Sequence, residues 1–163
     1  MAMEIVGIKE IYDKPVNKEQ RLIAFKLNGE LVGVDITDVV KITKTDDITS
    51  VPKTPEHVLG VMNLRGNIIP VVTLKKKLGL PENEQIPDEK LIVVVDTQLG
   101  YIGCLVDQID GAIIINSDEI LPPPMNSIGI DPEFIKGVVM VERNNNRELL
   151  IILDISKIFK EEE

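Results

Sequence analysis

The sequence predicts an all-β protein assembled from two copies of one small unit. Tryptophan is absent and aromatic residues make up only 3%, so the 44% of hydrophobic residues are mainly Val, Ile and Leu, which favour strands. Short apolar runs alternate with turn residues about every ten positions, a pattern typical of barrels and sandwiches. The same order of runs occurs twice, at an offset of about seventy residues.

The first copy begins with two strands joined by a tight turn. Asn28-Gly29 is a strong hairpin signal, because both residues tolerate the positive φ angles of a two-residue turn. In chain order we expect a strand at 21–27, a returning strand at 31–35, one helical turn within 36–42 capped by Thr37 or Asp38, and a short strand at 48–51.

A second hairpin holds the most distinctive stretch of the chain, Val-Met-Asn-Leu-Arg-Gly-Asn-Ile-Ile-Pro-Val-Val at 61–72. Asn63 and Gly66 suit a turn, which places the permanently charged Arg65 at its tip. There the arginine either faces water or binds a partner. Pro70 cannot donate a hydrogen bond to a neighbouring strand, so its strand is predicted to lie at a sheet edge or to be bulged.

A polar, proline-bearing segment at 81–88 separates the two copies and is the predicted linker. Just before it, a short helix at 73–78 is expected to turn its three lysines toward solvent. A unit of about 60 residues buries too little surface to be stable alone, so the two units should pack together and leave a groove between them. The expected division is an N-terminal segment (1–20), a first β-barrel subdomain (21–80), the linker (81–88), a second β-barrel subdomain (89–158) and an acidic C-terminal tail (159–163).

Composition argues against several classes of partner and location. The net charge of −9 disfavours binding to nucleic acid or to an anionic membrane surface. The chain contains no run of about 18 apolar residues, so no membrane insertion is expected, and its start does not read as a secretory signal. A single cysteine, Cys104, fits a reducing compartment. We therefore expect a cytoplasmic protein.

The residues that usually carry chemistry are scarce. The one histidine, His57, lies in an apolar position of the repeat and is expected to be a partly buried structural residue. Cys104 lies within an apolar strand and is expected to act as a small buried hydrophobe. We find no spacing typical of a metal site, a calcium loop or a phosphate-binding loop. The sequence therefore predicts a binding or scaffolding protein, with no enzymatic activity, cofactor or metal.

The stretch at 61–72 closely resembles the family of the chemotaxis coupling protein CheW, and the similarity covers roughly residues 21–159. Four further segments carry it, at 33–42, 51–55, 103–107 and 150–154. The resemblance implies two packed SH3-like five-stranded β-barrels with a few short helices. It also implies a non-enzymatic adaptor that couples the cytoplasmic tip of chemoreceptors (methyl-accepting chemotaxis proteins) to the regulatory domain of the histidine kinase CheA. Such an adaptor is recruited to receptor arrays at the inner membrane.

By position, the resemblance assigns candidate binding residues. The receptor-binding groove would be lined by Val39, Val61, Met62, Asn63, Leu64, Arg65 and Gly66. The kinase-binding face would include Val106, Asp107, Asp110 and Gly111.

Two positions depart from the family pattern. Lys41 stands where an acidic residue is common, and Thr73 stands where an aspartate is often found. A reversed charge at the rim of an interface mainly alters association rate and partner choice, so Lys41 is expected to tune partner preference. Two alternative functions remain at this stage. The same module could serve another kinase array, such as one for surface motility, or the barrels could bind an oligonucleotide or a small ligand.

Overall fold

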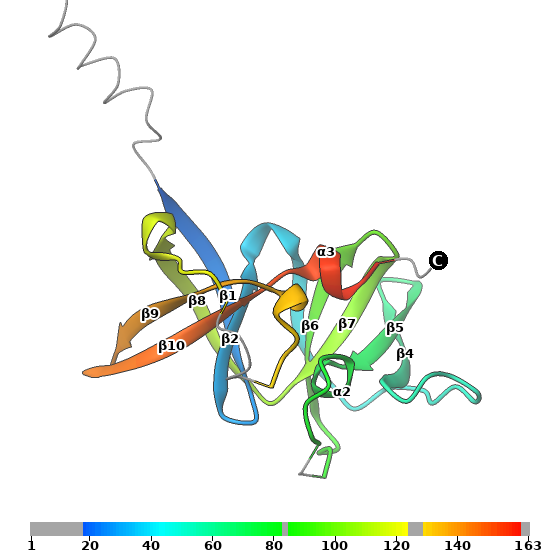
Figure 1. The fold of residues 1–163 in the computed structure, drawn as a ribbon. Coiled ribbons are helices and arrows are strands. Elements are labelled where there is room, and N and C mark those ends of the chain that lie inside the picture. Colours follow the sequence, from blue (N-terminus) through cyan, green and yellow to red (C-terminus); the bar gives the residue numbers. More distant parts are fainter. Residues whose placement is uncertain (1–17, 83–84, 124–128, 161–163) are drawn as a thin grey trace, which may run out of the picture.

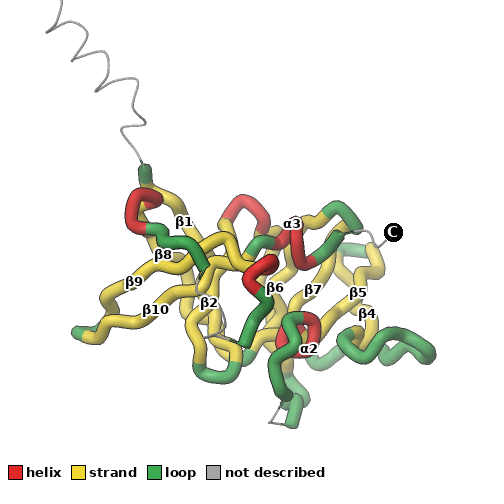
Figure 2. Tube along the Cα trace, viewed as in Figure 1, coloured by secondary structure: helices red, strands yellow, loops and turns green. Residues whose placement is uncertain are grey.

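The computed structural model describes residues 18–82, 85–123 and 129–160. Most of the expected N-terminal segment and of the acidic tail lies outside these ranges. The described chain is mainly strands with a few short helices, as predicted (Figures 1 and 2). The strands are β1 (Glu19–Leu27), β2 (Glu30–Asp35), β3 (Val39–Thr45), β4 (Val58–Leu64), β5 (Asn67–Thr73), β6 (Lys90–Thr97), β7 (Gly100–Val106), β8 (Gln108–Asn116), β9 (Ile135–Arg143) and β10 (Asn146–Leu153). The short helices are η1 (Ile36–Asp38), α2 (Leu74–Lys77), η2 (Ser117–Glu119), η3 (Pro132–Phe134) and α3 (Ile155–Ile158).

The strands form two five-stranded sheets that exchange strands between the two copies of the repeat. Sheet A has the order β8-β1-β2-β10-β9, and sheet B has the order β3-β6-β7-β5-β4. Each sheet therefore combines the first two strands of one copy with the last three strands of the other. Parallel ladders join the copies, because β10 pairs with β2 and β5 pairs with β7. Figure 1 shows the two sheets side by side.

This exchange corrects the expected division of the chain. A boundary at 81–88 does not separate the sheets, since sheet A takes strands from both ends of the chain and sheet B takes the strands between residues 39 and 106. The repeat itself agrees with the order of elements, in which two hairpins and a short helix occur twice. A repeat shows which segments are alike, but not which copy each strand joins.

Both predicted hairpin turns are present. Asn28 and Gly29 have φ values of 51° and 82°, and Arg65 and Gly66 have φ values of 52° and 87°. Two successive positive φ angles define the turn type that matches the twist of a two-stranded ribbon. The turn at the tip of β4–β5 therefore holds Arg65 where the sequence predicts it.

Two local predictions in the first copy are wrong in detail. The helical turn covers only Ile36–Asp38, and its cap is Asp35, whose carboxylate accepts a hydrogen bond from the Thr37 N–H at 2.9 Å. The remaining part of the predicted turn belongs to β3. The strand expected at 48–51 is reduced to a single bridge between Thr49 and Val61.

Pro70 lies inside sheet B, between β7 and β4, and not at an edge. It is opposite Val61, whose own N–H and C=O bond to Thr49 at 2.8 and 2.9 Å. The Val61–Pro70 pair therefore exchanges no hydrogen bonds, and the ladder to β7 begins only at Val71. No neighbouring strand needs the N–H that proline lacks, so an interior position is tolerated.

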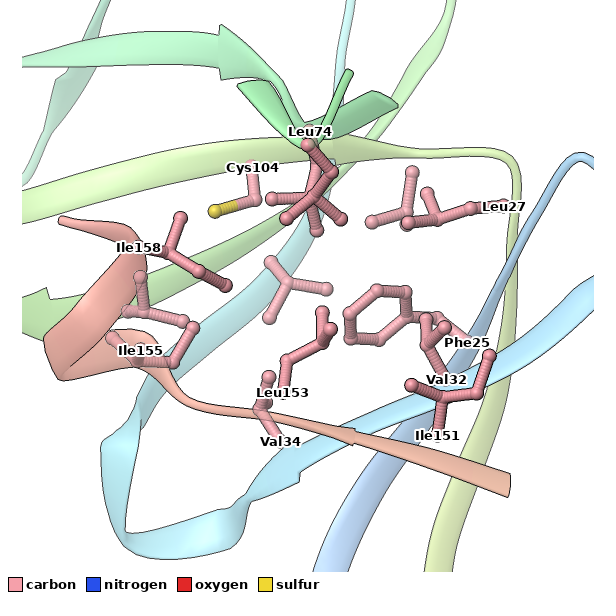
Figure 3. Close-up of a cluster of buried hydrophobic side chains, with 14 of the residues drawn as sticks. Phe25, Leu27, Val32, Val34, Leu74, Cys104, Ile151, Leu153, Ile155 and Ile158 are labelled. Atoms are coloured by element: carbon pink, nitrogen blue, oxygen red, sulfur yellow. The ribbon is translucent and has the colours of Figure 1, made fainter. Parts of the chain in front are cut away.

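The core has three layers. Residues from all five strands of sheet A form one cluster, so the sheet curls around its own interior, and sheet B encloses a second cluster. The third and largest cluster lies between the sheets and includes Phe25, Val32, Cys104 and Ile151 (Figure 3). Since most strands bury both faces, their apolar runs are nearly continuous. Packed side chains fill the space between the two sheets. A groove between the sheets could therefore lie only at the edge of their interface.

Candidate functional site

The β4–β5 hairpin presents a rigid polar tip. Asn63 Oδ1 accepts a hydrogen bond from the Gly66 N–H at 2.7 Å, which closes the turn across Arg65. Arg65 is exposed and, within the part of the chain that the structure describes, makes no ion pair. The local backbone therefore holds an unneutralised guanidinium at the surface, where a partner can reach it.

The two faces of this hairpin differ. Met62 and Leu64 are 7% and 6% exposed and point into the interior of sheet B. Val61 and Asn63 lie on the opposite face, which follows from the alternation of side chains along a strand. Of the residues predicted to line a groove, Met62 and Leu64 therefore support the surface from inside. Val61, Asn63, Arg65 and Gly66 are the ones that lie on the outer face or at the tip.

Sequence reasoning missed Ile68 as a surface residue. Ile68 pairs with Asn63 across the ladder and is 66% exposed, the highest value among the exposed large hydrophobic residues described. Pro70, also exposed, lies on the same outer face opposite Val61. Ile69 is buried between these two exposed residues, so the alternation of side chains along a strand, counted from the turn at Arg65 and Gly66, is the signal that could have found them.

Val39 does not belong to the hydrophobic cluster that contains Met62 and Leu64, the buried residues of the β4–β5 hairpin. It is half-buried, pairs with Val95 and packs against the layer between the sheets. Its strand, β3, is one edge of sheet B, whereas β4 is the other edge. Lys41 is exposed on β3, next to the register shift that separates it from Val39.

The four predicted kinase-binding residues are contiguous around the step from β7 to β8, but two of them are buried. Val106 is 3% exposed and belongs to the layer between the sheets. The Asp110 side chain is 4% exposed and forms an ion pair of 2.8 Å with Arg143. Gly111 has a φ of 95° at the bulge where β8 pairs with β1. Asp110 is the extra residue of that bulge, because Ala24 pairs with Gly111 and Phe25 with Ile109.

The buried Lys75 contacts the partly exposed Asp107, which the sequence did not predict. The residue Lys75 is only 4% exposed, so the expectation that the three lysines of α2 all face solvent is wrong. Its Nζ lies 2.8 Å from Asp107 Oδ1 and 3.8 Å from Glu82 Oε1. Asp107 also accepts a hydrogen bond from the Asn28 N–H at 2.8 Å. Lys75, Glu82 and Asp107 line a cavity of about 130 Å³ with Leu105 and Val106.

Cys104 and His57, the residue types that most often carry chemistry, are buried and half-buried. Burial raises the pKa of the Cys104 thiol to about 12, which suppresses the reactive thiolate. His57 is half-buried, and its carbonyl accepts a hydrogen bond from the Thr73 N–H at 2.8 Å. Among the described residues, no group of His, Cys, Asp and Glu side chains could hold a metal ion. Nor does any described helix have the length and apolar character needed to cross a membrane.

Asp35 and Asp38, at the two ends of η1, have pKa values shifted in opposite directions. Partial burial acts to raise the pKa of Asp35, but hydrogen bonds from Thr37 and the charge of Lys136 outweigh it and lower this pKa. The pKa of Asp38 is raised, first by partial burial and then by the nearby charges of Asp35, Asp154 and Asp96, against the opposing effect of Lys136. This corner of the molecule is therefore an acidic surface with one neighbouring cation.

Residues 21–163 match the family model described as "CheW-like domain". The chain belongs to the CheW-like family. It is 36% identical over 152 residues to the chemotaxis protein CheW of Treponema pallidum, covering 91% of this chain and 87% of that protein. It is 34% identical to the chemotaxis protein CheW of Thermotoga maritima, covering 88% of this chain and 90% of that protein.

A solved structure shares the fold. The scaffolding protein TtCheW from Thermoanaerobacter tengcongensis superposes with a TM-score of 0.74 at 33% identity, covering 86% of this chain and 92% of that chain. The family and the all-β fold predicted from the sequence are thus confirmed. CheW-like proteins of chemotaxis are scaffolds and not enzymes, so the prediction of a non-enzymatic adaptor is confirmed as well.

Proposed function

We propose that this protein is a cytoplasmic adaptor, recruited to receptor arrays at the inner membrane, that holds chemoreceptor tips and the regulatory domain of CheA at a fixed geometry. The observation that carries the proposal is the CheW-like match over residues 21–163, together with the exposed Arg65 turn of its β4–β5 hairpin. The adaptor needs no chemistry of its own. Ligand-driven changes in the receptor would bias the kinase through differential contacts, which typically supply about 1–3 kcal/mol.

For the receptor, we propose the outer face and tip of the β4–β5 hairpin. The exposed Ile68 and Pro70 supply apolar area, and Arg65 supplies a charged group that fixes register. The bond between Asn63 and Gly66 keeps the tip in one conformation, which lowers the entropy cost of binding. Met62 and Leu64 would act by supporting this face, while Val39 and Lys41 on β3 would border it from the other edge of the sheet.

For the kinase, the segment around Val106, Asp107, Asp110 and Gly111 stays the proposed face. Because two of these four residues are buried, they would act differently from the exposed ones. Val106 at the end of β7 and Asp110 in β8 would support this face from inside, and Asp107, with 35% of its side chain exposed, is within reach of a partner. Ile114, 57% exposed on the same strand, would extend this face with apolar area.

Size-exclusion chromatography with light scattering tests the proposal. The purified protein is mixed with a CheA regulatory domain or with a receptor-tip fragment from the same cell. We expect co-elution with each partner, and we expect Arg65→Ala to lose the receptor but keep the kinase. Arg147→Ala is the matched control, because Arg147 is an exposed arginine, with 69% of its side chain accessible, in the corresponding hairpin of sheet A.

Each other outcome has a definite meaning. If the parent protein binds the kinase but not the receptor fragment, the receptor site would have to lie away from the hairpin. Lys41 would then be the first residue at which to reverse the charge. Binding to neither partner would contradict the chemotaxis proposal, and the pair would then be replaced by the kinase and receptor of another array, such as one for surface motility. Tight binding in a fluorescence titration with single-stranded DNA would favour the oligonucleotide alternative, which the net charge of −9 opposes.

A further inference from the structure

The chain crosses from sheet B to sheet A at one residue. Strand β7 of sheet B ends at Val106, β8 of sheet A begins at Gln108, and Asp107 lies between them. A joint of one residue has few ways to adjust, so the contacts of Asp107 constrain how the two sheets meet.

Asp107 bonds to both sheets. On the side of sheet A, its N–H donates to the Lys26 carbonyl at 3.0 Å, and its Oδ2 accepts the Asn28 N–H at 2.8 Å. On the side of sheet B, its Oδ1 lies 2.8 Å from the Nζ of Lys75, which belongs to α2. We call the group of Asn28, Lys75 and Asp107 the clasp.

Two further contacts hold the clasp in place. The Asn28 side-chain amide donates to the Pro81 carbonyl at 2.7 Å, so the β1–β2 turn also binds the segment that follows α2. Glu82 Oε1 lies 3.8 Å from Lys75 Nζ, and the side chains of Lys75 and Glu82 are 5% and 12% exposed. Because Lys75 is desolvated, its ammonium needs carboxylate partners in fixed positions.

The layer between the sheets sets their orientation through the fit of its side chains alone. Its contacts are apolar, and hydrophobic burial is non-directional. Charge-assisted hydrogen bonds are directional and short, and buried ionic groups can select one arrangement among several of similar packing energy. The clasp is the charged contact that the described structure places across the two sheets at this joint.

We propose that Asp107 is a positioning residue, which fixes the orientation of sheet A relative to sheet B through Lys75 and Asn28. This inference deepens the proposed function and rests on it in one respect. If the receptor binds the hairpin of sheet B and the kinase binds near β8 of sheet A, the clasp sets the geometry in which one reports on the other. Asp107 then acts on kinase coupling through the joint, in addition to any direct contact.

Distance measurements between spin labels test the proposal. One label is attached at Lys44→Cys on β3 of sheet B and one at Arg147→Cys on β10 of sheet A, both exposed positions. The native Cys104 is 1% exposed and escapes labelling in the folded protein. We expect one narrow distance distribution in the parent protein, and a broadened or shifted distribution in Lys75→Met and in Asp107→Asn. The double variant should resemble the single variants, because the two residues act as a unit.

Arg143→Met is the matched control. It removes the cation from the buried Asp110, but both partners of that pair lie in sheet A. We expect it to lower the melting temperature and to leave the distance distribution unchanged. If Lys75→Met and Asp107→Asn also lower the melting temperature without changing the distribution, the clasp is only a source of stability and the proposal is overturned.

A second measurement uses the coupling itself. The affinity for the kinase domain is measured with and without the receptor fragment, and we expect the clasp variants to reduce the receptor-dependent change about tenfold, within the range typical of coupled sites. In Lys75→Met, which changes a residue outside both proposed binding faces, each partner should still bind alone. Unchanged coupling alongside a changed distance distribution would overturn the link to function. If the parent protein binds neither partner, the proposed function fails, and the distance distributions still decide whether the clasp orients the sheets.

Discussion

Gly60 and Gly137 occupy equivalent positions in the two copies, and each lies where a crossing segment leaves no room for a side chain. Gly60 precedes Val61, which bridges to Thr49, and Gly137 precedes Val138, which bridges to Leu121. A Cβ at Gly60 would overlap the Thr49 carbonyl, and one at Gly137 would lie 2.7 Å from the Leu121 carbonyl oxygen. Both obstacles are backbone atoms, which cannot rotate away.

We therefore expect Gly60→Ala and Gly137→Ala each to lower the free energy of unfolding by about 3 kcal/mol or more, since overpacking here forces backbone shifts. Gly33→Ala is the control, because its Cβ would meet its nearest neighbours at 3.4 Å, and we expect a cost of about 1 kcal/mol or less. Urea denaturation followed by circular dichroism measures all three. Equal costs at the three positions would contradict the explanation.

Replacing Thr73 with valine should make the folded protein more stable. Its side chain is 2% exposed and its Oγ1 has no hydrogen-bond partner in the described structure, so folding desolvates a hydroxyl without compensation. The isosteric Thr73→Val keeps the backbone N–H that donates to His57. We expect the free energy of unfolding to rise by about 1 kcal/mol, measured by chemical denaturation.

Asp154→Ala at the equivalent cap of α3 should lower the free energy of unfolding by about 1 kcal/mol, because Asp154 accepts the Lys157 N–H at 3.3 Å.

The ionised carboxylate of Asp38 should lower the stability of the folded protein at neutral pH. Its pKa is raised by partial burial and by the neighbouring charges of Asp35, Asp154 and Asp96. A carboxyl whose folded pKa is raised contributes stability below its model value of 3.8 and loses that contribution as the pH rises. We expect Asp38→Asn to raise the melting temperature slightly at pH 7 and to lose this advantage near pH 3.

The matched control for that comparison is Asp46→Asn, which removes the same charge from an exposed position just beyond the end of β3. We expect a smaller change in melting temperature at pH 7. If Asp46→Asn gives the same gain as Asp38→Asn, the effect comes from the net charge of −9 and not from the local environment of Asp38.

Cys104 should be unreactive until the protein unfolds. With its pKa raised to about 12, only about one thiol in ten thousand is ionised at pH 8. We expect an aromatic disulfide reagent to modify it slowly at pH 8 and within the mixing time in denaturant. Rapid modification of the folded protein would contradict the burial shown here.

The same raised pKa gives a signed pH dependence. The thiol stabilises the folded state fully below its model value of 9.0, and this contribution is lost as the pH rises from 9 toward 12, because the unfolded chain ionises first. Cys104→Ala should therefore lose less stability than the parent protein between pH 9 and pH 11. Thermal melts of the two proteins at these values measure the difference.

The local features of the fold were predictable because single residues determine them. Asn28-Gly29 and Arg65-Gly66 identify both tight turns, and Gly79, with a φ of 80°, follows the end of α2. The exchange of strands between copies was not predictable, because the apolar runs of both copies are nearly alike and each fits either sheet. Pro70 was misplaced because the bonding direction of its partner Val61 depends on Thr49, which is distant in sequence.

The candidate site was predictable in part. The family motif identifies the hairpin and its Arg65, but a motif contains interior and surface residues alike, so Met62 and Leu64 were assigned to a binding surface although they are core. Asp107 was assigned to a partner. Its contacts with Lys75 and Asn28 join segments 32 and 79 residues away, and no local pattern in the sequence reports such contacts.

The exchanged strands also constrain how the chain is made. During synthesis, β1 and β2 leave the ribosome first, yet their neighbours β8, β9 and β10 are among the last strands to emerge. Sheet B has all five of its strands once Val106 has appeared, while sheet A must wait for Leu153. At about 5–20 residues per second, the apolar β1–β2 hairpin stays without its final neighbours for several seconds. Sheet B can close before sheet A is complete, and its residues in the layer between the sheets then offer that hairpin an apolar surface until the last strands arrive.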